Sequence, residues 1–286
     1  MQYVFGIILF LFGSALGSFI NVIVNRYNTG LSFFKGRSIC FSCNHKLQTK
    51  DLVPILSFLF LRGKCRYCQS KIPKETLIFE LLMGTLSVLA ALKSGLFSSA
   101  SGFNFLSPDF VIQADIIHFV QYLLITIIFG NILLISIYDL RHFIIPDSFL
   151  LYFAGFALIY HIIFGFSLFY ILAGLILALP FLLIFLISKG TWFGFGDVKY
   201  ILVLGFFLGF IEGLSAVILA FWIGATFSLL ALSLKKIAPH LNLPLIKNNL
   251  TIKSEIPFGP FLSVGVIISF CLSLDLFQIH ELFNIF

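Results

Sequence analysis

Residues 148–188 read SFLLYFAGFALIYHIIFGFSLFYILAGLILALPFLLIFLIS and contain no Asp, Glu, Lys or Arg. The stretch is 41 residues long, and a helix needs about 20 apolar residues to cross a bilayer. Two spanning helices joined by a tight turn near Gly165-Phe166-Ser167 account for this length. Such a hairpin returns the chain to the side of the membrane on which it began.

The hairpin separates two motifs that carry acidic residues. The motif YDLRHFIIPD, residues 138–147, precedes it, and the motif GFGDVK, residues 194–199, follows it. Because the chain crosses the membrane twice in between, Asp139 and Asp197 reach the same face. Charged groups at membrane depth are costly and are by default functional, so the two acids are the first candidates for a site.

The composition predicts a membrane protein. Hydrophobic residues make up 60% of the 286 residues and charged residues only 10%, whereas soluble chains carry about 25% charged residues. We therefore expect an all-α polytopic membrane protein with about eight transmembrane helices. The expected spans are residues 1–25, 75–92, 116–138, two within 148–188, one that begins before 199 and ends near 212, 213–234 and 258–274.

These spans predict four segments. Residues 1–25 form the first transmembrane helix, and residues 26–75 form a small cytoplasmic insert rich in cysteine. Residues 76–115 hold the second transmembrane helix and an outside loop. Residues 116–286 form a six-helix core that carries both acids. No internal repeat is evident.

The basic residues predict the orientation. Ten of the 18 Lys and Arg residues lie between Arg26 and Lys74, which is the positive-inside pattern of a cytoplasmic loop. Under this topology Lys93 is the one basic residue outside, and the N-terminus lies outside. The net charge of +6 then reflects orientation and attraction to an anionic bilayer, not nucleic acid. No removable signal peptide is expected, because no basic segment precedes the first apolar run.

Asp139 and Asp197 predict acid–base chemistry. Two carboxyl groups held close together cannot both ionise easily, so one stays protonated while the other acts as a base. Such a pair activates water for attack on a peptide carbonyl. The alternative stays open that both acids are structural, with Asp139 paired to Arg141 and Asp197 paired to Lys199.

The residues beside Asp197 predict how a substrate approaches. Gly194 and Gly196 allow a sharp backbone turn and close contact with a substrate strand. Lys199 either binds substrate, tunes the acidic pair or extends to the interface. Asp147 follows a proline and precedes an apolar run, which favours an N-cap over a catalytic role.

Four of the five cysteines form two CxxC pairs, Cys40 with Cys43 and Cys65 with Cys68. The spacing is typical of a zinc ribbon, and four thiolates suit tetrahedral Zn²⁺. A redox pair is the alternative. Cys271 lies in an apolar span and is interpreted as a packing residue.

The motifs together resemble the type IV prepilin peptidase/N-methyltransferase family, membrane aspartic proteases of the GxGD class. The resemblance covers nearly the whole chain. Its motifs are GSFINV with Arg26 (residues 17–26), the two CxxC pairs, PILS (54–57), RGKC (62–65), Glu80-Leu81 with Gly84, residues 139–147, GFGDVK (194–199) and IPFGPF (256–261).

The resemblance implies a function. It implies that Asp139 and Asp197, not Asp147, are the catalytic pair, and that the enzyme cleaves the short basic leader of type IV prepilin or pseudopilin precursors at the inner face of the bacterial cytoplasmic membrane. Relatives with the cysteine insert also methylate the new N-terminus with S-adenosylmethionine. The residues that bind this donor are unknown. Glu80 is a weak candidate, with an ion pair to Lys74 as the alternative.

Two competing functions remain at this point. A presenilin-like protease of broader specificity also carries tyrosine–aspartate and GxGD motifs, but it has a Pro-Ala-Leu motif where this sequence reads PFGP at residues 257–260. A proton-coupled transporter also uses intramembrane acids, but transporters are built from repeats with a site near the midplane.

Overall fold

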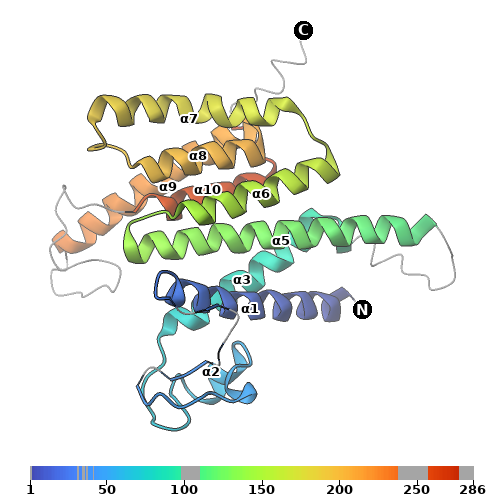
Figure 1. Cartoon of the computed structure of the whole chain (residues 1–286), viewed down its shortest axis with the longest axis vertical. Coiled ribbons are helices and arrows are strands. Elements are labelled where there is room, and N and C mark those ends of the chain that lie inside the picture. Colours follow the sequence, from blue (N-terminus) through green and yellow to red (C-terminus); the bar gives the residue numbers. More distant parts are fainter. Residues whose placement is uncertain are drawn as a thin grey trace. The chain divides into compact units, whose positions relative to one another are not determined.

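The computed structural model describes residues 2–30, 32–33, 36, 38–40, 42–97, 110–237 and 257–276. Within these ranges the chain is helical, as expected, and the β pairing consists of two isolated antiparallel bridges in the cysteine insert. The chain divides into two compact units, residues 1–134 and 135–286. Figure 1 labels the helices in chain order.

The first unit holds two long helices and the insert between them. Helix α1 spans Gln2–Arg26 and helix α3 spans Lys74–Lys93. In its described part the insert contains a 3-10 turn, Thr49–Asp51, the five-residue helix α2, Leu56–Phe60, and the two β-bridges. The first part of helix α5, Phe110–His142, completes the unit.

Helices α1 and α3 pack through small residues. A Cβ added at Gly13 would lie 2.6 Å from the Met83 carbonyl oxygen, and one added at Gly17 would lie 2.5 Å from the Phe79 carbonyl oxygen. Glycines four residues apart allow close approach of two membrane helices. The Ser87 hydroxyl donates a hydrogen bond to the Leu9 carbonyl oxygen at 2.9 Å, which adds a polar link to this interface.

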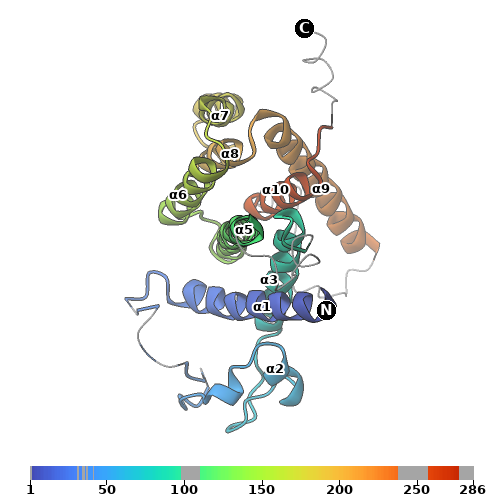
Figure 2. The ribbon, with the colours of Figure 1, turned by 90° about the vertical axis from the view of Figure 1, so that its right-hand side faces the viewer.

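The second unit is a helical bundle built around a short central helix. It begins with the end of α5 and continues with α6 (Asp147–Phe164), α7 (Leu168–Ser188), α8 (Phe195–Leu208), α9 (Phe210–Ile237) and α10 (Gly259–Leu272). Helix α8 packs against α6, α7, α9 and α10. Tyr200, Ile201 and Leu204 on α8 are fully buried in this core, so the helix that carries Asp197 is enclosed by its neighbours (Figure 2).

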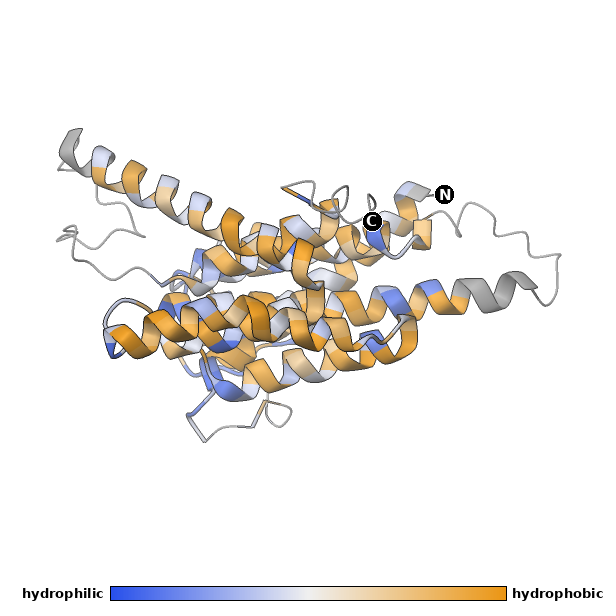
Figure 3. Cartoon of the chain, turned by 90° about the horizontal axis from the view of Figure 1, so that it is seen from above, coloured by the Kyte–Doolittle hydropathy of each residue, from blue (hydrophilic) through white to orange (hydrophobic). Residues whose placement is uncertain are grey.

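Among the residues that the structure describes, six helices are long and apolar enough to cross a membrane: α1, α3, α5 from Ile116, α6, α7 and α9 to Ser233. Helices α8 and α10 have 14 residues each, about 21 Å at 1.5 Å per residue, so they are shorter than the hydrocarbon layer. Apolar residues dominate the length of the long helices in Figure 3. Their exposed faces carry large apolar side chains such as Phe169, 79% exposed, and Ile187, 78% exposed. A multi-pass membrane protein explains such surfaces.

All eight predicted helices are present, although two of them are shorter than a full span. The turn of the hairpin lies between Phe164 and Leu168, as expected. Helix α5 is longer than expected, because it continues through Asp139 and ends only at His142. The predicted loops at 93–115 and 235–255 lie largely outside the described residues.

Candidate active site

Asp139 lies in the last turn of α5 and is only 5% exposed. The helix ends just after it, because Phe143 adopts a left-handed conformation with a φ of 56° and donates its N–H to the Asp139 carbonyl oxygen at 2.8 Å. Pro146 then excludes continued helix for the residue before it. The end of α5 therefore fixes the backbone of Asp139. The chain then turns into the remaining residues of the same motif, 143–147.

The carboxylate of Asp139 is held by the start of α10. The backbone N–H of Gly259 donates a hydrogen bond to Asp139 Oδ2 at 3.0 Å, and this contact is buried. A Cβ at residue 259 would lie 2.6 Å from the same oxygen. Glycine is therefore required here by space, because any side chain would displace the carboxylate.

Asp197 lies in the first turn of α8, two residues after the helix begins at Phe195. Gly194 is the N-cap, and a Cβ there would lie 3.1 Å from Asp197 Oδ2. A Cβ at Gly196 would lie 3.3 Å from Ile145 Cβ. The absence of a side chain at Gly194 thus leaves room for the Asp197 carboxylate. The absence of one at Gly196 leaves room for Ile145 in the loop that follows α5.

The two acids face one open pocket. Its volume is about 520 Å³, and its lining includes both carboxylates and both glycines of the GxGD motif. Asp139 lies close enough to Asp197 for the two carboxyl groups to interact electrostatically. The remaining lining residues are Phe143, Ile144, Ile145, Pro146, Asp147, Phe195 and Lys199.

Lys199 does not form the ion pair with Asp197 that a structural role of the acids would require. Its ammonium group forms an ion pair with Asp147, not with Asp197, and it lies 4.9 Å from the centre of the Phe195 ring. The prediction that Asp147 is an N-cap is wrong: Pro146 is the N-cap of α6, and Asp147 is the first helical residue. The carboxylate of Asp147 is therefore described by its ion pair with Lys199.

A second layer of polar groups supports Asp139, and the sequence analysis missed it. The Ser263 hydroxyl donates to the Gly259 carbonyl oxygen at 2.9 Å, and the Tyr200 hydroxyl lies 2.9 Å from the Ser263 hydroxyl. All of these contacts are buried. Tyr200 lies on α8 three residues after Asp197, so the network joins the helices of both acids through α10. The signal in the sequence was Ser263, a polar residue within the apolar run of the last span.

The four cysteines of the insert meet, although 21 residues separate the two pairs. The sulfur atoms of Cys40, Cys43, Cys65 and Cys68 all lie within 4.8 Å of one another. Cys40 Sγ and Cys68 Sγ are 3.8 Å apart, and tetrahedral zinc with a Zn–S bond of about 2.3 Å requires a separation of about 3.8 Å. The cluster fits a tetrahedral metal ion.

The two cysteine knuckles have the same backbone hydrogen bonds. Cys40 N–H donates to His45 and accepts at its carbonyl from Asn44, while Cys65 does the same with Ser70 and Gln69. Asn44 and Gln69 have φ values of 54° and 58°. The sequences ICFSCNHK (39–46) and KCRYCQSK (64–71) repeat this pattern. The two knuckles therefore form a short repeat within the insert, although no internal repeat was expected from the sequence.

Electrostatics distinguish the thiols. Backbone N–H groups of Cys43 and Ser42 stabilise the thiolate of Cys40 and lower its pKa to about 6. A hydrogen bond from the Ser70 hydroxyl lowers the pKa of Cys68. At Cys43 a hydrogen bond from His45 favours the thiolate, but burial and the neighbouring Cys68 and Cys40 outweigh it and raise the pKa to about 11. A cation at the centre would remove this repulsion between neighbouring thiolates.

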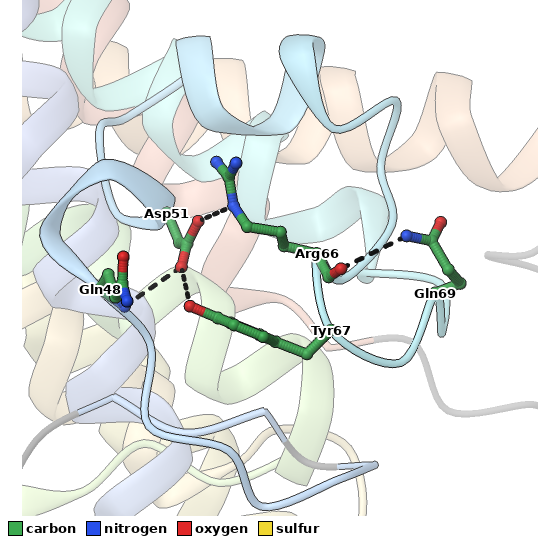
Figure 4. A network of polar contacts seen from close by, with 5 residues as sticks. All are labelled: Gln48, Asp51, Arg66, Tyr67 and Gln69. Carbon is green, nitrogen blue, oxygen red and sulfur yellow. Dashed lines mark hydrogen bonds and ion pairs between the residues drawn. The ribbon is translucent and has the colours of Figure 1, made fainter.

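Asp51 ties the 3-10 turn to the second knuckle (Figure 4). Its carboxylate accepts from Arg66 Nε at 2.6 Å, from the Tyr67 hydroxyl at 3.2 Å and from the Gln48 N–H at 3.2 Å. Burial alone would raise the pKa of Asp51, but these donors, led by Arg66, lower it. The network therefore holds a charged carboxylate whose side chain is only 3% exposed.

Glu80 lies in α3 and is 5% exposed. Its Oε2 accepts the backbone N–H of Ile55 at 2.6 Å. The contact joins α3 to the residue before α2, so the acid already has a structural partner in the insert.

Two family models match separate parts of the chain. Residues 11–94 match the Bacterial Peptidase A24 N-terminal domain, and residues 124–229 match the Type IV leader peptidase family. The first match covers α1, the insert and α3. The second covers most of α5 to α9, including Asp139 and Asp197.

Curated relatives match the chain over most of its length or over a part of it. The prepilin leader peptidase/N-methyltransferase of Bacillus subtilis (strain 168) is 28% identical over 92% of each chain. The protein of that name from Aeromonas hydrophila is 27% identical over 90% of this chain and 87% of the relative. The Vibrio cholerae protein of that name is 39% identical over 28% of this chain and 35% of the relative. No solved structure matches the chain.

Proposed function

We propose that this chain, which belongs to the type IV leader peptidase family, removes the short basic leader from type IV prepilin-like precursors. The observation that carries the proposal is one open pocket lined by Asp139, Asp197, Gly194 and Gly196. The family match favours a leader peptidase over a presenilin-like protease of broader specificity and over a transporter.

The two acids act as a dyad. One carboxyl group is protonated and the other is ionised, because two adjacent carboxylates repel each other. The ionised group removes a proton from a water molecule as that water attacks the scissile carbonyl carbon, while the protonated group donates to the carbonyl oxygen. Collapse of the tetrahedral intermediate transfers a proton to the amine and breaks the C–N bond. The products are the leader carboxylate and a new N-terminal amine, and the dyad regains its single shared proton.

The surrounding residues position the dyad and the substrate. The N–H of Gly259 fixes Asp139, so the carboxylate is oriented before substrate binds. Gly194 and Gly196 leave the side of Asp197 open to a substrate backbone. Lys199 and Asp147 neutralise each other in the pocket lining, and exchange of this pair for a basic leader residue would let Asp147 bind substrate.

The site faces the cytoplasm of a bacterium in this proposal. All basic residues except Lys93 lie on the same side as the dyad under the predicted topology, which supports an inside location. A leader that lies at the inner end of a substrate's hydrophobic helix reaches a dyad at this face. The membrane is then the inner membrane, with the N-terminus of the chain outside.

Methylation of the new N-terminus is the second proposed activity. It is supported by the names of the relatives, each a prepilin leader peptidase/N-methyltransferase. S-adenosylmethionine, when bound, supplies the methyl group that the new amine accepts. Glu80 was the candidate for this half of the reaction, but its carboxylate binds the Ile55 N–H, so we give it a structural role and assign no residues to the methyl donor.

Zinc is the proposed metal of the cysteine cluster, and its role is structural. All four ligand positions are filled by thiolates, which leaves no open position for substrate. Where the structure describes residues 26–74, the insert has little secondary structure of its own, so a metal held by both knuckles would supply much of its stability.

The proposal is tested with a pilin-like precursor and the purified chain in detergent. Mass spectrometry of the product is carried out with and without S-adenosylmethionine. We expect loss of the leader in both reactions and one additional methyl mass only with the donor. An intact precursor would contradict the peptidase, and cleavage without added methyl would contradict only the transferase.

A further inference from the structure

The insert carries an exposed apolar patch, which we define as Leu52, Val53, Leu56, Leu59 and Phe60. The last three lie on α2 at spacings of three and four residues, so they share one face of that helix. Leu56 is 46% exposed, Leu59 59% and Phe60 83%. Leu52 and Val53 extend the patch and are 39% and 42% exposed.

The patch is held at the depth of a membrane-spanning helix. Ile55, the residue before α2, donates its N–H to Glu80 Oε2 at 2.6 Å. Glu80 lies six residues after Lys74, where α3 begins, which is about 9 Å along the helix. In Figure 1, α2 lies within the length of α1 rather than beyond its end, and Figure 2 places it to the side of α1.

The backbone shows that this position of α2 is enforced. Ile55 has φ and ψ of 62° and −53°, a conformation that a β-branched residue rarely adopts and that is retained only where the surroundings impose it. The hydrogen bond to Glu80 and the one from the Ser57 N–H to the Val53 carbonyl oxygen, 3.0 Å, hold both sides of this residue.

Charges lie at the margins of the patch. No charged residue occurs between Leu52 and Leu61, whereas Lys50, Arg62 and Lys64 flank it and are exposed. Asp51, the acid that precedes the patch in the sequence, is paired with Arg66, so the unpaired charge beside the patch is basic. Long basic side chains extend from an apolar surface to the head groups, and anionic lipids attract them. An apolar centre with a basic margin complements the boundary between acyl chains and anionic head groups.

We propose that the apolar patch is immersed in the lipid leaflet beside α3 and docks the cysteine insert onto the bilayer. The contact with Glu80 holds α2 beside a membrane-spanning helix. Lipid surrounds such a helix wherever protein does not, so we take lipid to be what covers the patch. Docking keeps the insert at the membrane surface, next to helices α1 and α3 of its own unit. The inference is independent of the proposed peptidase activity.

Depth-dependent quenching of tryptophan fluorescence tests this proposal. The full chain, with Trp192→Phe and Trp222→Phe, carries Phe60→Trp as its single tryptophan, and Leu59→Trp serves as a second probe of the patch. Each variant is reconstituted in vesicles of phosphatidylcholine and phosphatidylglycerol with or without brominated acyl chains. Lys46→Trp, an exposed position in the first knuckle, is the matched control.

We expect brominated lipid to remove most of the fluorescence at residues 59 and 60 and aqueous acrylamide to have little effect there. The control at residue 46 should respond to acrylamide and not to brominated lipid. Quenching of the patch by acrylamide alone would place it in water and overturn the proposal. Protection from both quenchers would indicate cover by protein, including a second copy of the chain, and would also overturn it. Equal quenching of the control by brominated lipid would contradict docking through this patch.

Discussion

At Gly259, one added carbon atom would occupy the space that the carboxylate of Asp139 uses. We predict that Gly259→Ala lowers kcat about 10²-fold, because misplacement of a catalytic group by about 1 Å has an effect of this size. The Cβ would lie 2.6 Å from Asp139 Oδ2, so the acid must move. Steady-state kinetics on a pilin-like precursor measure the effect.

Gly155→Ala is the matched control for this prediction. A Cβ at Gly155 meets no atom within 4 Å, and alanine is favoured over glycine in a helix by about 1 kcal/mol. This variant should keep full activity. Equal kinetics for Gly259→Ala and wild type would contradict the positioning of Asp139 by α10.

At the scale of residues, the sequence revealed acids but not their partners. The GxGD motif and the parity of spans predicted that Asp139 and Asp197 reach one face, and both line one pocket. The pairing of Lys199 with Asp147 could not be predicted, because a contact between residues 52 apart in the sequence depends on how α6 packs on α8. The contact between Asp139 and Gly259 was missed for the same reason.

At the scale of elements, the cysteine insert depends on four ligands from two knuckles. We predict that Cys40→Ser or Cys65→Ser removes bound zinc and unfolds the insert, because one lost thiolate leaves an incomplete tetrahedral site. Metal analysis and limited proteolysis of the insert measure both effects. Cys271→Ser, outside the cluster, should leave zinc content unchanged. A full zinc complement in Cys40→Ser would rule out the proposed site.

The affinity of this site for zinc should depend on pH. The ligands bind as thiolates, so protons compete with the metal. The pKa of Cys40 is lowered to about 6, whereas that of Cys43 is raised to about 11. Acidification therefore protonates Cys43 before Cys40 in the metal-free cluster. We expect affinity to fall continuously from pH 8 to pH 6 and further below it, measured by competition with a chromophoric chelator. A constant affinity over this range would contradict thiolate ligation.

The positions of the helices were predictable, because the length of each uncharged apolar stretch is read directly from the sequence. All eight predicted helices occur, and the hairpin turn lies where Gly165 was expected to place it. Helix ends were predicted less well. Asp139 was placed after the third span, yet α5 continues to His142, because an acid at a membrane surface does not end a helix. The left-handed Phe143 and the following Pro146 do so instead.

At the scale of the whole molecule, the topology predicts which loops face the cytoplasm. An alkaline phosphatase fused after Phe166, in the hairpin turn, should be exported and active. The same enzyme fused after Gly190 should be inactive, because the proposed topology has Lys189 and Asp197 inside. The two fusions differ by one helix, α7, so each is the control for the other. Activity after Gly190 with none after Phe166 would invert the proposed orientation.

The central claim is that Asp139 and Asp197 together hydrolyse the leader. The most direct measurement is cleavage of a pilin-like precursor by wild type, Asp139→Asn and Asp197→Asn at equal amounts of membrane-inserted protein. Loss of the shared proton and of the base should lower kcat by at least about 10²–10⁴-fold in both variants. Asp147→Asn, which keeps both acids and breaks the pair with Lys199, should retain more activity than either. Undiminished cleavage by Asp139→Asn or Asp197→Asn would contradict the account.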